Sequence, residues 1–252
     1  MHIGSNIIRL DRVDSTNRYL RSIADEVPAG TVVLALEQSR GQGRSGRVWN
    51  ACRGKSLTFS FLLQQSHDDF PMTFYMLFPA VAVVHYLLSL DVPARIKWPN
   101  DVIVKGRKIG GILVQTISRS TERRVITGIG LNVLQETQDF PQNIRDTAGS
   151  ILGLTGKKID PEKLFLSLLS VLETMHRDLQ HSDGWPQLLK MWSDNCAHMN
   201  EPITIYQSGA VVRGDFDGLD EDGFAVIKTK TKKLVIKDYN RVTLRRTHDT
   251  RD

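Results

Sequence analysis

Apolar and polar positions along the first two-thirds of the chain predict strands alternating with helices. β-Branched residues at 31–38 predict one strand, and alternating positions at 55–65 predict another. A long apolar run predicts a buried helix at about 73–90. Between residues 94 and 134, four strand-like pieces are separated by glycine or Pro-Asn signals, which favours a meandering, largely antiparallel sheet.

Helix-start signals mark three other segments. Residues 13–26 open with side chains that can cap a helix and continue with an apolar stripe. In 160–180, Asp160 stands at the N-cap and Pro161 at the first helical position, and leucines recur on one face. A further helix is expected at 184–196.

The pattern changes near the C-terminus. From Glu201 to Arg245 the chain consists of five short alternating runs separated by Asp-Gly turn signals, which predicts a small antiparallel barrel. We therefore expect an α+β protein in two units: a domain at 1–198, with helices packed on a mixed, largely antiparallel sheet, and a β-domain at 199–252.

Composition narrows the class of protein. The 252 residues are 40% hydrophobic and 24% charged, as in an ordinary globular protein. The net charge of +5 favours acidic or phosphate-bearing partners, but is too mild to indicate nucleic-acid binding. Cys52 and Cys196 cannot build a disulfide framework, and no secretory signal is evident, so we expect a reducing cytoplasm. The run at 71–90 contains Pro79 and other interruptions, which favour a core helix over a membrane span.

The stretch "GQGRSGRVW" (41–49) carries the most chemistry. Its glycine amides can approach a phosphate, Arg44 and Arg47 offer planar forks to phosphate oxygens, and Trp49 offers a stacking face for a purine. The spacing matches neither the dinucleotide fingerprint nor the P-loop. Taken alone, the stretch could equally be an exposed loop kept soluble by its arginines.

Three other stretches have both a plain and a functional interpretation. "KWPND" (97–101) is either an ordinary turn or a rigid one that holds Asn100 and Asp101 beside a site. "KIGGIL" (108–113) is either a bulge beside a surface lysine or a place where a ligand approaches the strand. "GIGLNV" (128–133) repeats this ambiguity.

Taken in order, with "DSTN" (14–17) and Gln38 ahead of the loop, these motifs resemble those of the biotin protein ligases. The resemblance runs over nearly the whole chain. It implies a class II synthetase-like catalytic domain followed by an SH3-like barrel. It also implies synthesis of biotinyl-5′-AMP from biotin and ATP with Mg²⁺, and transfer of the biotinyl group to a lysine of a biotin carboxyl carrier domain, as in acetyl-CoA carboxylase.

The resemblance also assigns roles to residues. The expected biotin-binding residues are Ser15, Thr16, Asn17, Gln38, Gly41, Lys108, Gly111 and Gly128. The expected ATP- and adenylate-binding residues are Gln42, Gly43, Arg44, Arg47, Trp49, Asn100, Lys108 and Asn132. The expected catalytic residues are Lys108, Arg44 and Asp101, with Asp101 orienting or deprotonating the acceptor amine.

Two features qualify this assignment. The histidines show no metal-ligand spacing, so no protein metal site is expected, and Mg²⁺ would arrive on the nucleotide. Where many family members have arginine as the second residue of the loop, this chain has Gln42, which loses a charge and a bidentate fork. The hold on the adenylate would then be looser, unless a basic residue such as Arg40 compensates.

Three alternatives remain at this point. A lipoate ligase resembles this family in fold and in adenylate chemistry. A DNA-binding repressor is disfavoured because "DSTN" begins at residue 14 and leaves no room before it for a helix-turn-helix domain. A paralogue that only binds biotin is suggested by Gln42 alone. We expect no nucleic-acid or membrane partner, and either a monomer or a homodimer.

Overall fold

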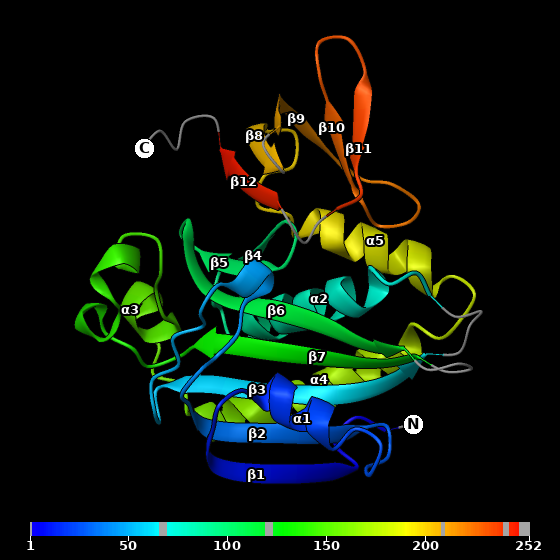
Figure 1. Ribbon diagram of the computed structural model, residues 1–252. Helices are drawn as coiled ribbons and strands as arrows, with labels where there is room; N and C mark the ends of the chain where they lie inside the picture. Colours follow the sequence, from blue (N-terminus) through cyan, green and yellow to red (C-terminus); the bar gives the residue numbers. More distant parts are fainter. Residues whose placement is uncertain (1, 66–69, 119–122, 208–209, 239–241, 247–252) are drawn as a thin grey trace.

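The computed structural model describes residues 2–65, 70–118, 123–207, 210–238 and 242–246. Their strands form two separate sheets, one mixed and seven-stranded, the other antiparallel and five-stranded (Figure 1). Helices cover both faces of the larger sheet, so the α+β class expected from the sequence is confirmed.

The larger sheet has the strand order β1-β2-β3-β7-β6-β5-β4. Its strands are β1 (Asn6–Val13), β2 (Thr31–Gln38), β3 (Ser56–Gln65), β4 (Ala94–Lys97), β5 (Asp101–Val104), β6 (Arg107–Ser118) and β7 (Arg123–Asn132). Strand β1 runs parallel to β2, and the remaining pairs are antiparallel. The sequence predicted every strand except β1. None of the β1 residues is fully buried, so this charged edge strand carries only a weak hydrophobic pattern.

Helices pack on the sheet unequally. On one face lie α2 (Phe74–Ser89) and α4 (Pro161–Asp178), with α5 (Gly184–Asp194) packed against α2; on the other face lies the short α1 (Thr16–Ser22) (Figure 1). Twelve of the sixteen residues of α2 are buried, which confirms the expected core helix. Among the described residues, no helix is both long and apolar enough to cross a membrane.

Four short helical segments were not predicted, because each is too brief for its apolar period to be recognised. They are η1 (Arg44–Gly46), η2 (Thr137–Asp139), η3 (Gln142–Ile144) and α3 (Ile151–Thr155).

The smaller sheet has the order β11-β10-β9-β8-β12. Its strands are β8 (Pro202–Gln207), β9 (Ala210–Leu219), β10 (Ala225–Lys228), β11 (Lys233–Ile236) and β12 (Val242–Arg246), which confirms the five predicted strands. The expected closed barrel is not confirmed, since within the described ranges no pairing joins the edge strands β11 and β12.

The two sheets meet through aromatic and polar contacts. Phe216 of β9 packs with Trp98 and Trp192, with ring centroids 6.5 and 6.1 Å away. On β12, Thr243 Oγ1 accepts a hydrogen bond from Arg47 Nη2 at 2.8 Å. The smaller sheet therefore touches both the "KWPND" turn, through Trp98, and the glycine-rich loop, through Arg47.

Candidate active site

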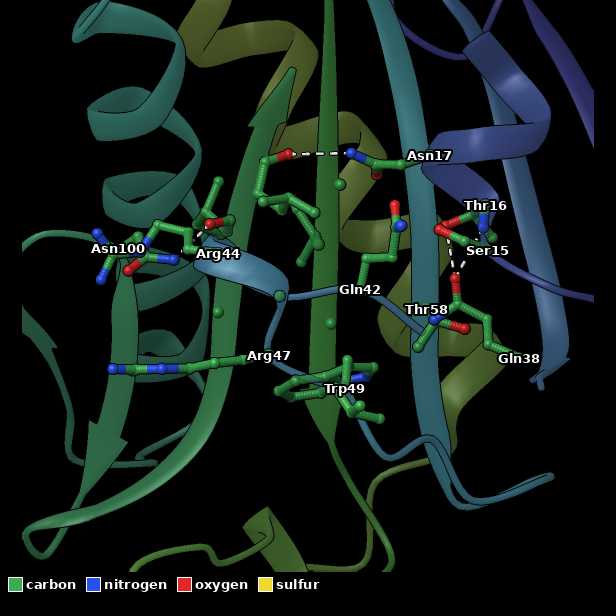
Figure 2. A pocket seen from close by; sticks show the side chains of 18 of the residues that line it. Ser15, Thr16, Asn17, Gln38, Gln42, Arg44, Arg47, Trp49, Thr58 and Asn100 are labelled. Atoms are coloured by element: carbon green, nitrogen blue, oxygen red, sulfur yellow. Dashed lines mark hydrogen bonds between the residues drawn. The ribbon is translucent and has the colours of Figure 1, made fainter. Parts of the chain in front are cut away.

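A cavity of about 120 Å³ lies against the sheet, between the start of α1 and the glycine-rich loop (Figure 2). It is lined by seven segments of the chain. The lining residues are Ser15, Thr16, Asn17, Gln38, Gln42, Gly43, Arg44, Arg47, Val48, Trp49, Thr58, Asn100, Asp101, Lys108, Gly111, Ile112, Leu113, Gly128, Ile129 and Gly130.

One end of the cavity is polar and neutral. Ser15 is the N-cap residue of α1 and is only 2% exposed, yet its side chain makes no capping hydrogen bond to the helix. The backbone N–H of Thr16 donates to Gln38 Oε1 at 2.7 Å, and the Thr16 hydroxyl lies 3.1 Å from the same oxygen. Since Ser15 does not use its hydroxyl as a cap, that hydroxyl is available to a ligand.

Asn17 completes this end and explains a glycine on β7. Its Nδ2 donates to the Leu113 carbonyl at 3.3 Å and lies 3.4 Å from Gln115 Oε1. A Cβ added at Gly128 would lie 2.0 Å from Asn17 Oδ1. Glycine is therefore required at position 128 to make room for the Asn17 side chain, and not only for the approach of a ligand.

An ion pair lies in the cavity wall. Lys108 Nζ is 2.6 Å from Asp101 Oδ1, and the side chains are 39% and 24% exposed. The pairing of β5 with β6 brings them together, with a register shift between Val102 and Ile103. The resemblance assigned the two residues to different steps of the reaction, and the structure places them in direct contact. A substitution of either residue therefore removes a charge that the other one faces.

The opposite end of the cavity is cationic. Figure 2 shows Arg44, Arg47 and Asn100 on the side away from Ser15 and Thr16. Asn100 Nδ2 donates to the Ile112 carbonyl at 2.6 Å, which fixes the amide. Asn100 Oδ1 is buried and has no hydrogen-bond partner among the described residues. A buried acceptor of this kind is normally satisfied, so it marks a place for a ligand donor or cation.

The loop residue Trp49 closes the cavity against β7. A Cβ at Gly130 would lie 2.6 Å from the Trp49 ring, so only glycine lets the indole lie flat on the strand. Lys108 Nζ lies 6.0 Å from the ring centroid, which is within reach of a cation–π contact. The Trp49 Nε1 proton is buried without a partner in the described part of the chain.

Two predicted residues do not line the cavity. Asn132 is occupied in a hydrogen-bond network outside the cavity: its Nδ2 donates to the Gly149 carbonyl, and its Oδ1 accepts from Gln135 Nε2, each at 3.0 Å. Gly41 instead packs under the loop, where a Cβ would lie 2.4 Å from the Trp49 carbonyl oxygen. The structure therefore gives both a supporting position.

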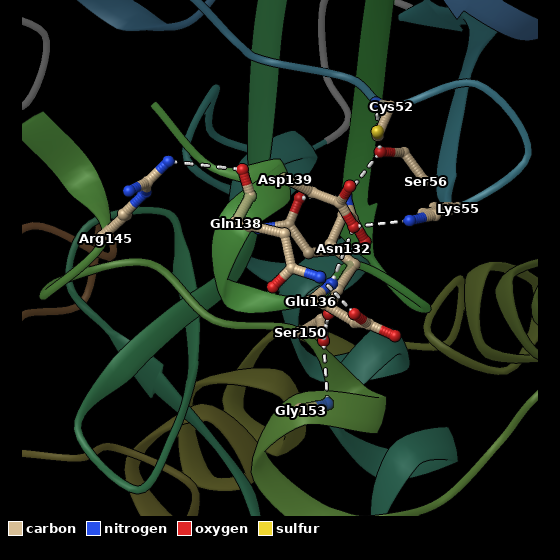
Figure 3. Close-up of polar contacts among 11 residues, drawn as sticks. Cys52, Lys55, Ser56, Asn132, Glu136, Gln138, Asp139, Arg145, Ser150 and Gly153 are labelled. Atoms are coloured by element: carbon tan, nitrogen blue, oxygen red, sulfur yellow. Dashed lines mark hydrogen bonds and ion pairs between the residues drawn. The ribbon is translucent and has the colours of Figure 1, made fainter. Parts of the chain in front are cut away.

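The same network fixes the chain that leaves the loop. Gln135 Nε2 donates to Ser56 Oγ at 2.6 Å, and this oxygen also accepts from the Cys52 N–H at 2.8 Å. Nearby, the Lys55 ammonium is 2.7 Å from Asp139 and holds the pKa of that carboxyl below its usual value (Figure 3). The segment that follows Trp49 is thus anchored to the end of β7.

The structure also adds lining residues that were not among the expected site residues. They are Val48, Thr58, Ile112, Leu113, Ile129 and Gly130. For Thr58 a signal existed: with Ser56 and Ser60 it is one of three hydroxyl residues that alternate with apolar residues along β3. Gly130 also carried a signal, as one of the two strand glycines of "GIGLNV". The remaining four are ordinary members of a loop or of a core strand, and give no such signal.

The chain is similar in sequence to known protein ligases. Residues 10–132 match the model of the biotin/lipoate A/B protein ligase family. The bifunctional ligase/repressor BirA of Bacillus spizizenii is 30% identical over 244 residues, covering 94% of this chain and 74% of that protein. The biotin–[acetyl-CoA-carboxylase] ligase of Paracoccus denitrificans is 30% identical over 232 residues, covering 90% and 96%.

A solved structure shows the same arrangement over nearly the full length. The biotin protein ligase of Aquifex aeolicus, in complex with biotin and ATP, superimposes with a TM-score of 0.84 and 29% sequence identity. The match covers 96% of this chain and 100% of that one.

Proposed function

The chain belongs to the biotin/lipoate A/B protein ligase family, and from this premise we propose that it is an ATP-dependent biotin–protein ligase. It joins biotin to a lysine of a biotin carboxyl carrier domain through biotinyl-5′-AMP. One observation carries the proposal: a single cavity has a neutral hydrogen-bonding end and a cationic end, and the Lys108–Asp101 ion pair lies in its wall. Biotinyl-5′-AMP has the same order of parts, a polar ring, an acyl phosphate and a nucleotide.

In the first step the biotin carboxylate oxygen attacks the α-phosphorus of ATP, and the bond to the β-phosphate breaks with loss of diphosphate. Negative charge spreads over the phosphoryl oxygens, so positioning and cationic stabilisation supply the rate. The Lys108 ammonium stabilises this charge, while Arg44 and Arg47 bind phosphates and Trp49 stacks on adenine. In the second step the acceptor amine attacks the acyl carbon, AMP leaves, and Asp101 takes the amine proton.

Magnesium is part of this proposal as a companion of ATP. No group of three or more histidine, cysteine or acidic side chains able to hold a metal occurs within the described residues. Asn100 Oδ1, which is buried and has no hydrogen-bond partner among the described residues, would hold the ion beside the nucleotide phosphates. When bound, the ion neutralises phosphate charge.

The loop must open for the reaction. Ligand pockets usually enclose about 300–1,000 Å³, more than the cavity holds with Trp49 on Gly130. We infer that the loop lifts to admit biotin and ATP and closes again over the adenylate.

We also propose that residues 1–198 form the catalytic domain and 199–252 an SH3-like barrel that assists ATP or carrier binding. The contact between Arg47 and Thr243 supports this role, since it joins the smaller sheet to the loop. Cys52 and Cys196 form no disulfide, which fits a reducing cytoplasm.

The direct test is incubation with biotin, MgATP and a purified carrier domain, followed by mass spectrometry of the carrier. One biotinyl group on a single lysine is expected. Lipoate in place of biotin is the matched comparison: a lipoate ligase would consume ATP with lipoate and leave biotin untouched.

Asp101→Asn is expected to separate the two steps. The amide keeps the shape of the side chain but cannot accept the amine proton, and general-base catalysis contributes about 10²–10⁴-fold. Biotin-dependent exchange of labelled diphosphate into ATP should persist, while single-turnover transfer from preformed adenylate to carrier should slow by about that factor. Equal loss in both assays would contradict the assignment of Asp101.

Gln42→Arg is expected to slow the release of biotinyl-5′-AMP from the enzyme. The guanidinium restores a charge and a bidentate fork at a position that lines the cavity. Release is measured by dilution of labelled adenylate-bound enzyme into unlabelled adenylate. An unchanged or faster release would show that Gln42 is not the cause of a loose hold.

A further inference from the structure

Beneath the neutral end of the cavity lies a buried hydroxyl that does not line it. Ser60, on the central strand β3, is 0% exposed. Its Oγ lies 2.7 Å from Thr16 Oγ1 and 2.6 Å from Asn17 Oδ1. Ser60 therefore touches two residues of the cavity wall from behind.

The proton positions in this cluster follow from groups that can only accept or only donate a hydrogen bond. The Leu113 carbonyl can only accept, so Asn17 Nδ2 faces it and Asn17 Oδ1 faces Ser60. A hydroxyl carries one proton, and Ser60 must give it to Oδ1, which can only accept. The Ser60 oxygen can then only accept at Thr16, so the Thr16 proton points to Ser60 and away from the cavity.

Gln38 is oriented by the same kind of constraint. The Thr16 backbone N–H can only donate, so the group that it meets must be Gln38 Oε1. With the Thr16 hydroxyl proton committed to Ser60, this oxygen keeps a second lone pair. The cavity end thus presents two acceptors, Thr16 Oγ1 and Gln38 Oε1, beside the rotatable hydroxyl of Ser15.

We propose that Ser60 is a positioning residue that sets the proton direction at Thr16, and so selects a ring with two N–H donors and one carbonyl. Resting on the proposed function, this ring is the cyclic urea of biotin. The dithiolane ring of lipoate has no N–H and would leave both acceptors buried and unpaired, which strongly disfavours binding.

Removing the Ser60 hydroxyl changes the direction of the Thr16 hydroxyl proton. In Ser60→Ala the Thr16 hydroxyl proton loses its acceptor and turns to Gln38 Oε1, 3.1 Å away. It then occupies the lone pair of Gln38 Oε1 that would otherwise accept a hydrogen bond from the ligand. One ligand N–H is then left unpaired in a buried site. We expect biotin binding to weaken by about 10- to 100-fold, with the KM for ATP unchanged.

The matched control is Thr127→Val. Thr127 is also 0% exposed and lies on the neighbouring strand β7, but its hydroxyl faces the Tyr75 carbonyl under α2, at 3.4 Å. Both variants lose a buried hydroxyl and some stability, measured as the shift in Tm. Only Ser60→Ala should weaken biotin binding, as read by calorimetry and by the KM for biotin.

A double-mutant cycle with Thr16→Val separates positioning from general damage. Without the Thr16 hydroxyl there is no proton to direct, so Ser60→Ala should cost no further biotin affinity. An equal cost in both backgrounds, or unchanged biotin binding in folded Ser60→Ala, would overturn the proposal. If Ser60→Ala does not fold, it is replaced by Ser60→Cys, whose thiol is a weak donor and acceptor. The same two results are then read: the loss of biotin affinity, and the absence of that loss in the Thr16→Val background. A wild-type enzyme inert towards biotin would instead refute the proposed function.

Discussion

Lys108→Ala is expected to slow adenylate formation by about 10²–10³-fold, because it removes a preorganised cation from the developing phosphoryl charge. The structure sharpens the reason for this loss. Lys108 is paired with Asp101 at 2.6 Å, so its removal also leaves an unneutralised carboxylate in the wall. That carboxylate would repel both the biotin carboxylate and the phosphates, adding to the loss.

Diphosphate exchange at saturating biotin and ATP measures this step directly. Lys105→Ala is the matched control: Lys105 lies in the adjacent β5–β6 turn, where its Nζ donates to the Leu154 carbonyl at 2.8 Å, and it does not line the cavity. The control should keep the wild-type rate. A wild-type rate in Lys108→Ala would remove Lys108 from the mechanism. If the repulsion from Asp101 contributes, Lys108→Ala combined with Asp101→Asn should recover part of the exchange rate.

The sequence predicted elements well where a single local pattern decided them. The N-cap Asp160 accepts from the N–H groups of Glu162 and Lys163, and Pro161 begins α4, as the local signals require. The strand β1 was missed because its pairing with β2 is parallel and distant, and its apolar residues are only half buried. Pairing of this kind depends on the neighbouring strand rather than on the strand's own pattern.

The candidate site also contains residues that local sequence identifies and residues whose role depends on distant parts of the chain. Most of the residues predicted from the motifs line one cavity. The motifs did not distinguish residues that line the cavity from residues that only support its wall. Asn132 directs both ends of its amide into the protein, and nothing in "GIGLNV" distinguishes it from a ligand contact. Ser60 was not singled out, since a serine in an apolar strand acquires meaning only when Thr16 and Asn17 are folded over it.

The glycines of β7 lead to the second large effect. Gly128 and Gly130 face the same side of the strand, and each makes room for a different residue. A Cβ at Gly128 would lie 2.0 Å from Asn17 Oδ1, and one at Gly130 would lie 2.6 Å from the Trp49 ring. Alanine at either position therefore damages a different end of one cavity.

Gly128→Ala is expected to abolish measurable biotin binding, because Asn17 is held in place by Ser60 and the Leu113 carbonyl and cannot retreat without breaking both contacts. Gly130→Ala is expected to raise the KM for ATP by about tenfold or more and leave biotin binding intact, because Trp49 lies on a loop that can lift. Each variant serves as the control for the other: both add one methyl to the same strand, at a stability cost of about 1–3 kcal/mol. Isothermal titration with biotin and, separately, with ATP in the absence of biotin distinguishes them, because diphosphate exchange itself requires bound biotin. Loss of both activities together in either variant would mean that the sheet itself has distorted, and that the two ends of the cavity are not served separately by these glycines.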